Sequence, residues 1–297
     1  MPHTERASMN ALTRRSFLAG TAAVALGGAV AGRASASVPA STLSTPATVE
    51  RLTGTDPFYV AHRGGGRNWP AMTAYAYSQA VKVPGLRALE ISVCLTADDV
   101  LVCSHNKTTL DMTGVDYTIR NETWETLSSL MVSPKYTLDT SQPARPFTRF
   151  DDVVERYLDD YVLFVEPKIN VAGGPLMARM AQLGQPERVV WKQPVNSTRF
   201  AVAKDHGFTT WGYVLDEPAH TGDNLPRYAA SDDIDLLGVY NAEDDDFMSS
   251  VIGAAQDNGK QSIVWELKTL TQRARALGLG ADGLMTSNVL GLVNAPL

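Results

Sequence analysis

Histidine, arginine and glutamate side chains stand at the ends of apolar runs in this sequence. His62 follows the apolar residues 58–61 and precedes Arg63 and three glycines. Arginine offers a planar fork of hydrogen-bond donors to a phosphate, and glycines let an anion approach the backbone closely. Histidine exchanges protons near neutral pH, so this run favours acid–base chemistry on a bound anion.

A carboxylate and an amine follow the apolar residues 162–165. Glu166 and Lys168 are two residues apart, so both side chains point to the same side of an extended chain. An acid at the carboxyl end of a barrel strand favours a functional role. The alternative is an ordinary Glu–Lys pair on the surface, and the spacing alone does not separate the two.

Residues 89–105 predict a β-hairpin that brings a histidine beside a carboxylate. A two-residue turn at 98–99 would place Ser92 opposite His105. Glu90 stands two residues before Ser92 and would share the same face. A slip of one residue would move the whole set to the other face.

The same register would place the only two cysteines, Cys94 and Cys103, opposite each other. Facing cysteines in an exported protein favour a cross-strand disulfide. Two small buried apolar side chains are the equal alternative. No basic side chain adjoins either thiol in the sequence, which argues against reactive thiol chemistry.

Strand and helix patterns alternate from residue 56 to the end of the chain. Near-continuous apolar strands indicate a parallel sheet, and about eight strand–helix repeats favour a closed (β/α)8 TIM barrel over a doubly wound open sheet. Residues 106–147 interrupt the alternation and predict an insertion after the second strand, over one end of the barrel. The predicted strands are 58–62, 88–95, 100–104, 161–168, 188–192, 209–215, 235–240, 262–267 and 283–286, and the predicted helices are 71–82, 124–131, 150–158, 176–183, 197–204, 247–257 and 270–277.

The first 36 residues predict a signal peptide of the twin-arginine type. Arg14 and Arg15 precede an uncharged run of small and apolar residues, and Ala34-Ser35-Ala36 fits a signal-peptidase site. A membrane-anchoring helix is the alternative, but the run is short and rich in Gly and Ala. We therefore expect the twin-arginine export machinery as a partner, a secreted or periplasmic location, and no stable membrane insertion after cleavage.

The chain that would remain after cleavage is expected to begin with a flexible segment and to carry a net negative charge. Residues 37–55 are rich in Ser, Thr and Ala and predict a flexible segment before a barrel domain at 56–297. Of 26 basic and 32 acidic side chains, four and one lie within residues 1–36, which leaves 22 and 31 and a net charge of −9. That balance, without a Lys/Arg cluster, excludes nucleic acid as a partner.

Taken together, these motifs resemble the glycerophosphodiester phosphodiesterase family. The resemblance implies a TIM barrel that hydrolyses a small phosphodiester substrate, a glycerophosphodiester, to glycerol 3-phosphate and an alcohol. The matching pieces run in order from about residue 58 to the end of the chain: Ala61-His62-Arg63-Gly64, Pro70-x-x-Thr73, Leu89-Glu90-Ile91, His105, Val165-Glu166-x-Lys168 and residues 280–288.

The resemblance also implies roles for single residues. His62 and His105 match the two histidines that act as general acid and base. Arg63 and Lys168 match positions that hold the phosphate. Trp265 matches an aromatic residue at a strand end, where we expect it to contact the substrate.

The metal site implied by the resemblance departs from the family pattern. Glu90 and Glu166 match carboxylates that hold a divalent cation, Ca2+ or Mg2+, which prefers oxygen ligands. The family usually has Glu-x-Asp on the second strand, whereas Ser92 stands at the Asp position and would offer a hydroxyl. We therefore expect a weaker or differently built metal site. The replacements at hand are Asp98, Asp99, Asp111 and water.

Further departures remove polar groups near the site. The family usually has Pro-Glu-Asn-Thr after the first strand, and here Ala71 and Met72 take the two central positions. His105 is followed by Asn106 where the family usually has Asp. Two other functions therefore stay open: a non-catalytic barrel that binds a phosphodiester or sugar phosphate, and a phospholipase D-like activity of the sphingomyelinase D kind. The His62-Arg63 start argues against the latter.

Overall fold

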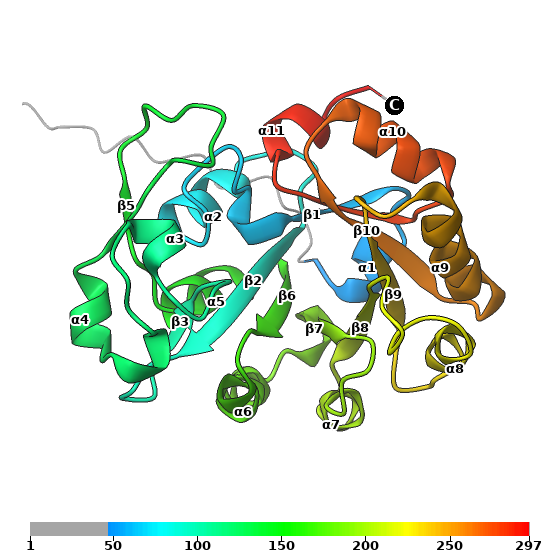
Figure 1. Cartoon of the computed structure of the whole chain (residues 1–297), viewed down its shortest axis with the longest axis horizontal. Coiled ribbons are helices and arrows are strands. Elements are labelled where there is room, and N and C mark those ends of the chain that lie inside the picture. The colour runs from blue at the N-terminus through cyan, green and yellow to red at the C-terminus, as the bar shows by residue number, and fades with distance from the viewer. Residues whose placement is uncertain (1–46, 297) are drawn as a thin grey trace, which may run out of the picture. The chain divides into compact units, whose positions relative to one another are not determined.

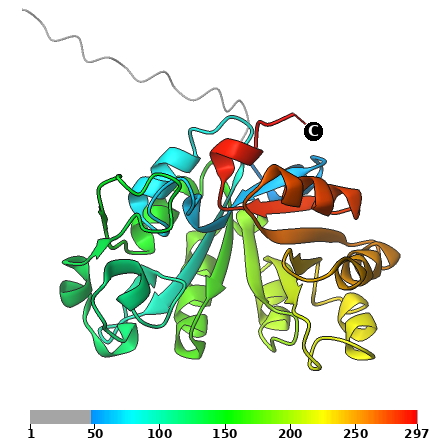
Figure 2. The same ribbon diagram turned by 45° about the horizontal axis from the view of Figure 1, so that its top comes forward.

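Eight parallel strands close into a barrel in the computed structural model, which describes residues 47–296. β1 pairs with β11 on one side and with β2 on the other, so the ring has no open edge (Figures 1 and 2). This confirms the predicted (β/α)8 barrel. The ring strands are β1 (Phe58–Ala61), β2 (Ala88–Leu95), β6 (Val162–Pro167), β7 (Val189–Pro194), β8 (Thr209–Val214), β9 (Leu236–Tyr240), β10 (Gln261–Leu267) and β11 (Gly283–Thr286).

The ring strands are the apolar runs that predicted them, and their bounds agree to within two residues. Every residue of β2 and of β6 is buried, as expected for strands that are covered on both faces. Ring strands that lie side by side also follow one another along the chain, because each connection returns the chain to start the next parallel strand. All eight carboxyl ends therefore open on the same end of the barrel.

Helices return the chain outside the ring, and several begin at side-chain caps that the sequence supplies. The hydroxyl of Thr73 accepts from the backbone N–H of Ala76 at α2, and the carboxylate of Asp244 accepts from Phe247 at α9. The helix α8 was not predicted. Its Pro226 lies in the first turn, where a proline is tolerated. The outer helices are α2 (Ala74–Ala80), α5 (Asp151–Tyr157), α6 (Gly173–Leu183), α7 (Phe200–Asp205), α8 (Asn224–Ala229), α9 (Asp245–Asp257), α10 (Leu270–Gly278) and α11 (Val289–Leu292).

A short helix before β1 packs against the interior of the ring. α1 (Val49–Thr53) buries Val49 and Leu52 in the cluster of apolar side chains that fills the barrel. This corrects the expectation of a flexible segment up to residue 55, because two apolar side chains anchor its last part. The predicted signal peptide, 1–36, lies outside the described residues. Among residues 47–296, no helix has the length and apolar character to cross a membrane.

The hairpin formed by β2 and β3 (Leu101–Cys103) has a register one residue away from the predicted one. Cys94 faces Val102 rather than Cys103. The cause is a three-residue loop, 97–99, whose last residue Asp99 has φ of 60°, the left-handed conformation that such loops use. The two thiols therefore point to opposite faces, and both are free and buried. Of the two alternatives for the cysteines, the disulfide is wrong and the pair of buried side chains is confirmed. Burial raises the pKa of Cys94 to about 12.

The segment between β3 and α5 forms the predicted insertion and has a small core of its own. Ile119, Leu127 and Phe147 are buried there together with Cys94. Because the insertion leaves from β3, which lies outside the ring, the ring itself stays closed (Figure 1). Its elements are α3 (Leu110–Thr113), α4 (Trp124–Ser128), β4 (Met131–Val132) and β5 (Arg145–Pro146), with β4 and β5 antiparallel.

Two glycines inside the ring make room for aromatic side chains. A Cβ on Gly238 of β9 would overlap the indole of Trp211, and a Cβ on Gly283 of β11 would overlap the ring of Phe58. Trp211 is fully buried and packs edge-to-face on Phe164, with ring centroids 5.7 Å apart. Packing as close as this leaves no space for an added methyl group.

Replacing Gly238 by alanine should therefore lower the free energy of unfolding by about 1–3 kcal/mol, because the methyl group overpacks the interior around Trp211. Gly253→Ala is the matched control. Gly253 lies inside α9 with no atom near the place of an added Cβ, so the same change should stabilise by about 0.5–1 kcal/mol. Urea unfolding measures both. Equal changes in the two variants would contradict this description of the interior.

Candidate active site

Charged and aromatic side chains meet in a cavity of about 280 Å3 at the carboxyl ends of the ring strands. Loops and strand ends at this end of a TIM barrel are where such barrels carry out their chemistry. All the predicted catalytic and phosphate-binding residues, together with Trp265, line this cavity, and Glu90 lies buried beneath it. The lining residues are His62, Arg63, His105, Glu166, Lys168, Lys192, Tyr213, Leu215, Tyr240, Trp265 and Glu266.

A tight turn at the end of β1 positions the first two of these residues. The 3-10 segment His62–Gly64 contains Arg63 in the left-handed conformation, with φ of 55°, and Gly65 continues with φ of 87°. This turn directs the backbone N–H of Arg63 to Oε2 of Glu90 at 2.9 Å. A non-glycine residue in this conformation is strained, and such strain is characteristic of functional sites.

The two buried glutamates are bridged by a lysine that the sequence analysis did not single out. Lys192 extends from β7, and its Nζ lies 3.1 Å from Oε1 of Glu90 and 2.8 Å from Oε2 of Glu166. Glu90 is 0% exposed, Glu166 2% and Lys192 4%. The first contact is a hydrogen bond, whereas the second is an ion pair whose angles are outside the hydrogen-bond range.

Further donors complete the surroundings of both carboxylates. Oε1 of Glu90 also accepts from the hydroxyl of Ser92 at 3.0 Å. Oε1 of Glu166 accepts from Nζ of Lys168 at 2.8 Å and from the hydroxyl of Tyr213 at 3.0 Å. Protein donors therefore hydrogen-bond to both oxygens of Glu90 and to Oε1 of Glu166, whereas Oε2 of Glu166 is buried with only the ion pair to Lys192.

The charges of the three groups stabilise one another. Burial alone would raise the pKa of Glu90, but Lys192, with weaker contributions from His62 and Arg63, outweighs burial and holds the pKa well below its ordinary value. Burial would likewise lower the pKa of Lys192, but Glu166 and Glu90 outweigh it and hold the pKa above its ordinary value. The lysine is thus an ammonium ion between two carboxylates near neutral pH.

His62 faces a carboxylate that the sequence analysis also missed. Its Nδ1 lies 3.3 Å from Oε1 of Glu266 on β10, and its Nε2 accepts from Nε of Arg63 at 3.2 Å. A carboxylate beside Nδ1 favours the tautomer with the proton on that nitrogen. Burial, and then the charge of Arg63, lower the pKa of His62, so the ring is neutral near pH 7.

His105 reaches the cavity from the loop that follows β3. Its Nδ1 lies 2.9 Å from Oδ1 of Asn106, the residue that replaces the usual Asp. Burial, followed by the charges of Arg63 and Lys168, lowers the pKa of His105 to about 4. The hydrogen bond with the neutral amide of Asn106 and the charge of Glu90 raise this pKa, but they do not outweigh burial and the two cations.

Aromatic rings form one wall of the cavity. Trp265 lies with its ring centroid 5.2 Å from that of Tyr213 and 5.9 Å from that of Tyr240. The first pair is edge-to-face and the second is tilted, and rings packed in this way hold each other in place and offer an apolar surface beside the charged groups. Trp265 lies where it can contact a bound molecule, although no contact in the structure assigns it that role.

The residues around Glu90 and Glu166 do not fit a divalent cation. Within residues 47–296, no group of three or more His, Cys, Asp or Glu side chains is arranged to hold a metal ion. Ca2+ takes six to eight oxygen ligands and Mg2+ six. A dication about 4 Å from the ammonium of Lys192 would be repelled by about 8 kcal/mol at an effective dielectric constant of about 20. Ser92 is no third ligand, since its hydroxyl donates to Glu90.

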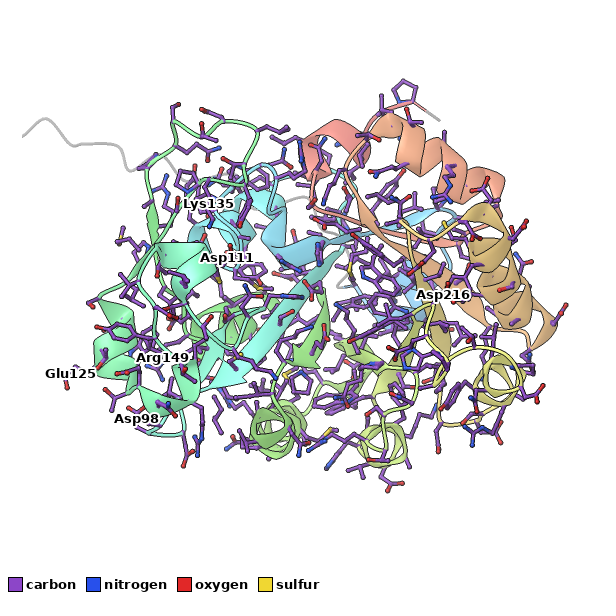
Figure 3. All side chains as sticks on the ribbon, in the orientation of Figure 1. Asp98, Asp111, Glu125, Lys135, Arg149 and Asp216 are labelled. Carbon is purple, nitrogen blue, oxygen red and sulfur yellow. The ribbon has the colours of Figure 1, made fainter. Side chains whose placement is uncertain are left out.

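The aspartates proposed as replacement ligands lie elsewhere. Asp98 accepts from the backbone N–H of Trp124, and Asp111 is paired with Lys135 at 3.0 Å (Figure 3). Asp99 pairs with Arg120 in the hairpin turn. Asp111 instead borders a small second cavity between the insertion and the first loop, which also includes Arg63, Met72 and His105 among its lining residues.

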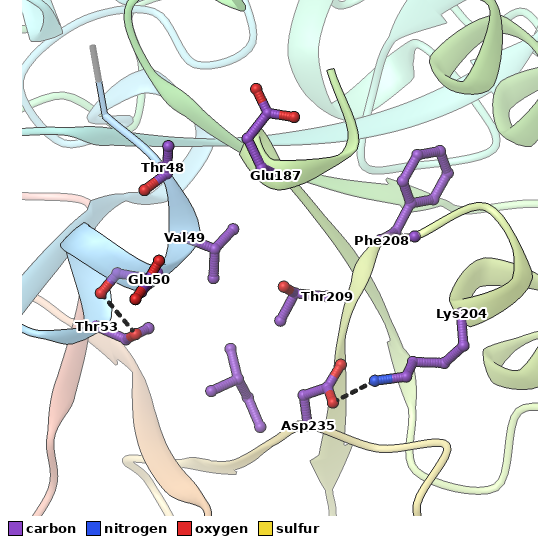
Figure 4. A pocket seen from close by; sticks show the side chains of 11 residues that line it. Thr48, Val49, Glu50, Thr53, Glu187, Lys204, Phe208, Thr209 and Asp235 are labelled. Carbon is purple, nitrogen blue, oxygen red and sulfur yellow. Dashed lines mark hydrogen bonds and ion pairs between the residues drawn. The ribbon is translucent and has the colours of Figure 1, made fainter. Parts of the chain in front are cut away.

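A larger cavity lies at the opposite end of the barrel, beside α1 (Figure 4). It is lined by residues at the starts of strands, such as Thr209 and Leu236, and by an ion pair between Lys204 and Asp235. It contains neither of the histidines nor the buried glutamates. Size therefore does not identify the functional site here, whereas the converging charges do.

Lys192, Tyr213 and Glu266 complete the site and were missed from the sequence. Lys192 ends the apolar run 189–191 in the same manner as Glu166 ends 162–165. The rule that polar residues at barrel strand ends are functional would have found it. Glu266 stands one residue before the end of β10, as Glu166 does in β6, so the same rule would have found it. Tyr213 carries no comparable signal, because its ring fits the apolar pattern of its strand.

Comparison with known proteins identifies the family of the chain. Residues 62–290 match the Glycerophosphoryl diester phosphodiesterase family, which is well over half of the chain. The chain belongs to this family. It is accordingly a phosphoric diester hydrolase of the glycerophosphodiester phosphodiesterase type, and such enzymes generally depend on a divalent cation. A comparison with functionally curated proteins gave no significant match.

Solved structures of glycerophosphodiester phosphodiesterases share the fold. The enzyme from Thermotoga maritima superposes with a TM-score of 0.62 at 19% identity, over 79% of this chain and 96% of that one. The enzyme from Agrobacterium tumefaciens gives 0.62 at 17%, over 78% and 98%. A phosphodiesterase from Oleispira antarctica, solved with the product sn-glycerol-3-phosphate, gives 0.61 at 17%, over 78% and 94%.

The environment of His105 makes a measurable prediction for this family member. An NMR titration of its ring should give a pKa of about 4, against about 6.5 in an unfolded chain. Because the unfolded state takes up the proton more readily, this ring reduces the free energy of unfolding as pH falls from about 6.5 toward 4. The His105→Gln variant identifies the resonance. A midpoint near 6.5 in the folded protein would show that the ring is not desolvated.

Proposed function

We propose that this family member hydrolyses glycerophosphodiesters to glycerol 3-phosphate and an alcohol, with His62 and His105 as the acid–base pair. The observation that carries the proposal is the convergence of both imidazoles on one cavity with three cationic side chains, Arg63, Lys168 and Lys192. A phosphodiester is an anion whose negative charge increases on the reacting oxygens. Preorganised cations at that place stabilise the transition state more than the ground state.

Each histidine has its own orienting partner. Glu266 lies beside Nδ1 of His62, and Asn106 lies beside Nδ1 of His105. In each ring the Nε2 atom is then the one that exchanges a proton, which for His62 requires that Arg63, whose Nε donates to that atom, turn to the phosphate. One neutral imidazole takes the proton from the attacking water. The other first takes up a proton from solvent, which the negative charge of the bound phosphodiester favours, and gives that proton to the oxygen of the leaving alcohol, so that protons balance over the reaction.

The anion-binding side chains have separate supports. Arg63 is fixed by its own backbone turn and lines both neighbouring cavities. Lys168 follows β6 and is held by Glu166. The proposal routes no step through Ca2+ or Mg2+, because the residues at Glu90 and Glu166 do not fit a divalent ion.

A non-catalytic binding barrel is the alternative that the geometry argues against. A barrel that only captured a phosphodiester would need the cationic side chains and no proton-transfer groups. Both histidines nevertheless line the cavity, and Glu266 is directed to one of them. The phospholipase D-like alternative differs from the proposed function in its product, since it would release the headgroup alcohol from an intact phospholipid.

Glycerophosphocholine is the substrate that tests the proposal, with glycerol 3-phosphate measured as product. His62→Ala and His105→Ala should each lower kcat/KM by about 10²–10⁴, the usual worth of a general acid or base. His206→Ala is the matched control, since His206 is exposed on the surface and should leave the rate unchanged. Saturable binding without turnover in the unaltered protein would favour the binding barrel, and choline release from an intact phospholipid would favour the third activity.

We also infer export from residues 1–36, which support a twin-arginine signal through Arg14-Arg15 and Ala34-Ser35-Ala36. In a host with this export pathway, the protein should appear outside the cytoplasm with Ser37 as its first residue. Replacing Arg14 and Arg15 by lysine should retain it inside. Mass spectrometry of the exported chain measures the cleavage. Export of the double-lysine variant at an unchanged level would contradict the inferred pathway.

A further inference from the structure

Lys192 occupies the position between Glu90 and Glu166 that a shared cation would take. Its ammonium lies within 3.1 Å of both carboxylates and is itself part of the cavity lining. The side chain is 4% exposed, so it reaches this position from inside the ring rather than from solvent. A mobile surface lysine would not be held in this way.

Two aromatic rings also lie close to the ammonium of Lys192. Nζ of Lys192 lies 5.4 Å from the ring centroid of Trp211 and 5.7 Å from that of Tyr213. Faces of aromatic rings attract cations at such distances. Tyr213 also donates to Glu166, so one ring supports both partners of the ion pair.

The charge at the centre of the site is already balanced. Three carboxylates around a dication leave one net negative charge, and so do two carboxylates around one ammonium. Ser92, which stands where the family pattern has an acid, removes one negative charge, and Lys192 supplies one positive charge. Replacing the acid alone, or the dication alone, would change the net charge of the site. Both replacements together leave it unchanged.

We propose that the ammonium of Lys192 is a built-in cation of this enzyme, which takes the place of a divalent metal ion and binds a phosphoryl oxygen of the substrate together with Lys168 and Arg63. This proposal rests on the proposed hydrolysis of a phosphodiester. It makes Lys192 a catalytic residue in contact with the substrate, and it makes the reaction independent of Ca2+ and Mg2+.

The first experiment measures metal binding without reference to activity. The mature protein is stripped with EDTA, dialysed, and titrated with CaCl2 and MgCl2 by calorimetry and by thermal unfolding. We expect no saturable heat and no shift in Tm. Saturable binding that is lost in Glu166→Gln would overturn the proposal, whatever the activity of the protein.

The second experiment reverses the replacement of the metal ion by Lys192. The double variant Ser92→Asp, Lys192→Ala restores a third carboxylate and removes the ammonium, and it should bind Ca2+ with a rise in Tm that grows with ion concentration. Ser92→Asp with Lys204→Ala is the matched control, because Lys204 lies on a surface ion pair at the other end of the barrel. Equal Ca2+ binding by the two double variants would contradict a role of Lys192 as the resident cation.

The third experiment uses activity. Hydrolysis of glycerophosphocholine should proceed in EDTA at a rate within about twofold of that in Ca2+ or Mg2+, and Lys192→Met should lower kcat by about 10²–10³, as for loss of one preorganised charge. Activity that vanishes in EDTA and returns with Ca2+ or Mg2+ would overturn the proposal. If the unaltered protein hydrolyses no phosphodiester with or without metal, the proposed function fails, and the two binding experiments still decide whether Lys192 holds the cation position.

Discussion

The buried ion pair of Lys192 with Glu90 and Glu166 is the interaction on which this site depends. Removing one partner of a buried pair typically costs about 3–5 kcal/mol, because the other charge is left without compensation. Here one ammonium serves two carboxylates that are almost fully excluded from solvent. Of the other charged groups that line the cavity, Lys168 donates to Glu166, and Glu266 pairs with His62.

The barrel makes that arrangement possible. The three members come from β2, β6 and β7, which are consecutive in the ring although 102 residues separate Lys192 from Glu90 in the chain. Parallel strands deliver their carboxyl ends to the same place, and the interior below is filled by aromatic rings that fit because Gly238 and Gly283 carry no side chain. The support is therefore rigid from the packed interior up to the charged end.

Local patterns predicted the fold well, because each strand is a continuous apolar run and each return helix has its own period. The register of the hairpin was predicted one residue off, since sequence alone does not separate a two-residue turn from a three-residue turn ending at Asp99. The helix α1 was hidden in a segment whose Ser and Thr content indicates flexibility. The role of its two apolar side chains is evident only from the barrel interior that they cover.

Part of the candidate site could be predicted from the sequence. His62, Arg63, Glu166 and Lys168 stand in motifs with local spacing, and the structure brings them to one cavity. The decisive residue, Lys192, has no partner close in sequence, and Ser92 looked like a lost ligand rather than one half of a compensated exchange. The loss of an acid at Ser92 can be interpreted only together with Lys192, whose charge balances it.

A crystal of the mature protein soaked in MnCl2 tests the central claim most directly, by anomalous scattering at the manganese edge. The account predicts no anomalous peak between Glu90 and Glu166, and density for the lysine nitrogen at that place. A peak between the two carboxylates, with the side chain of Lys192 turned away, would contradict it.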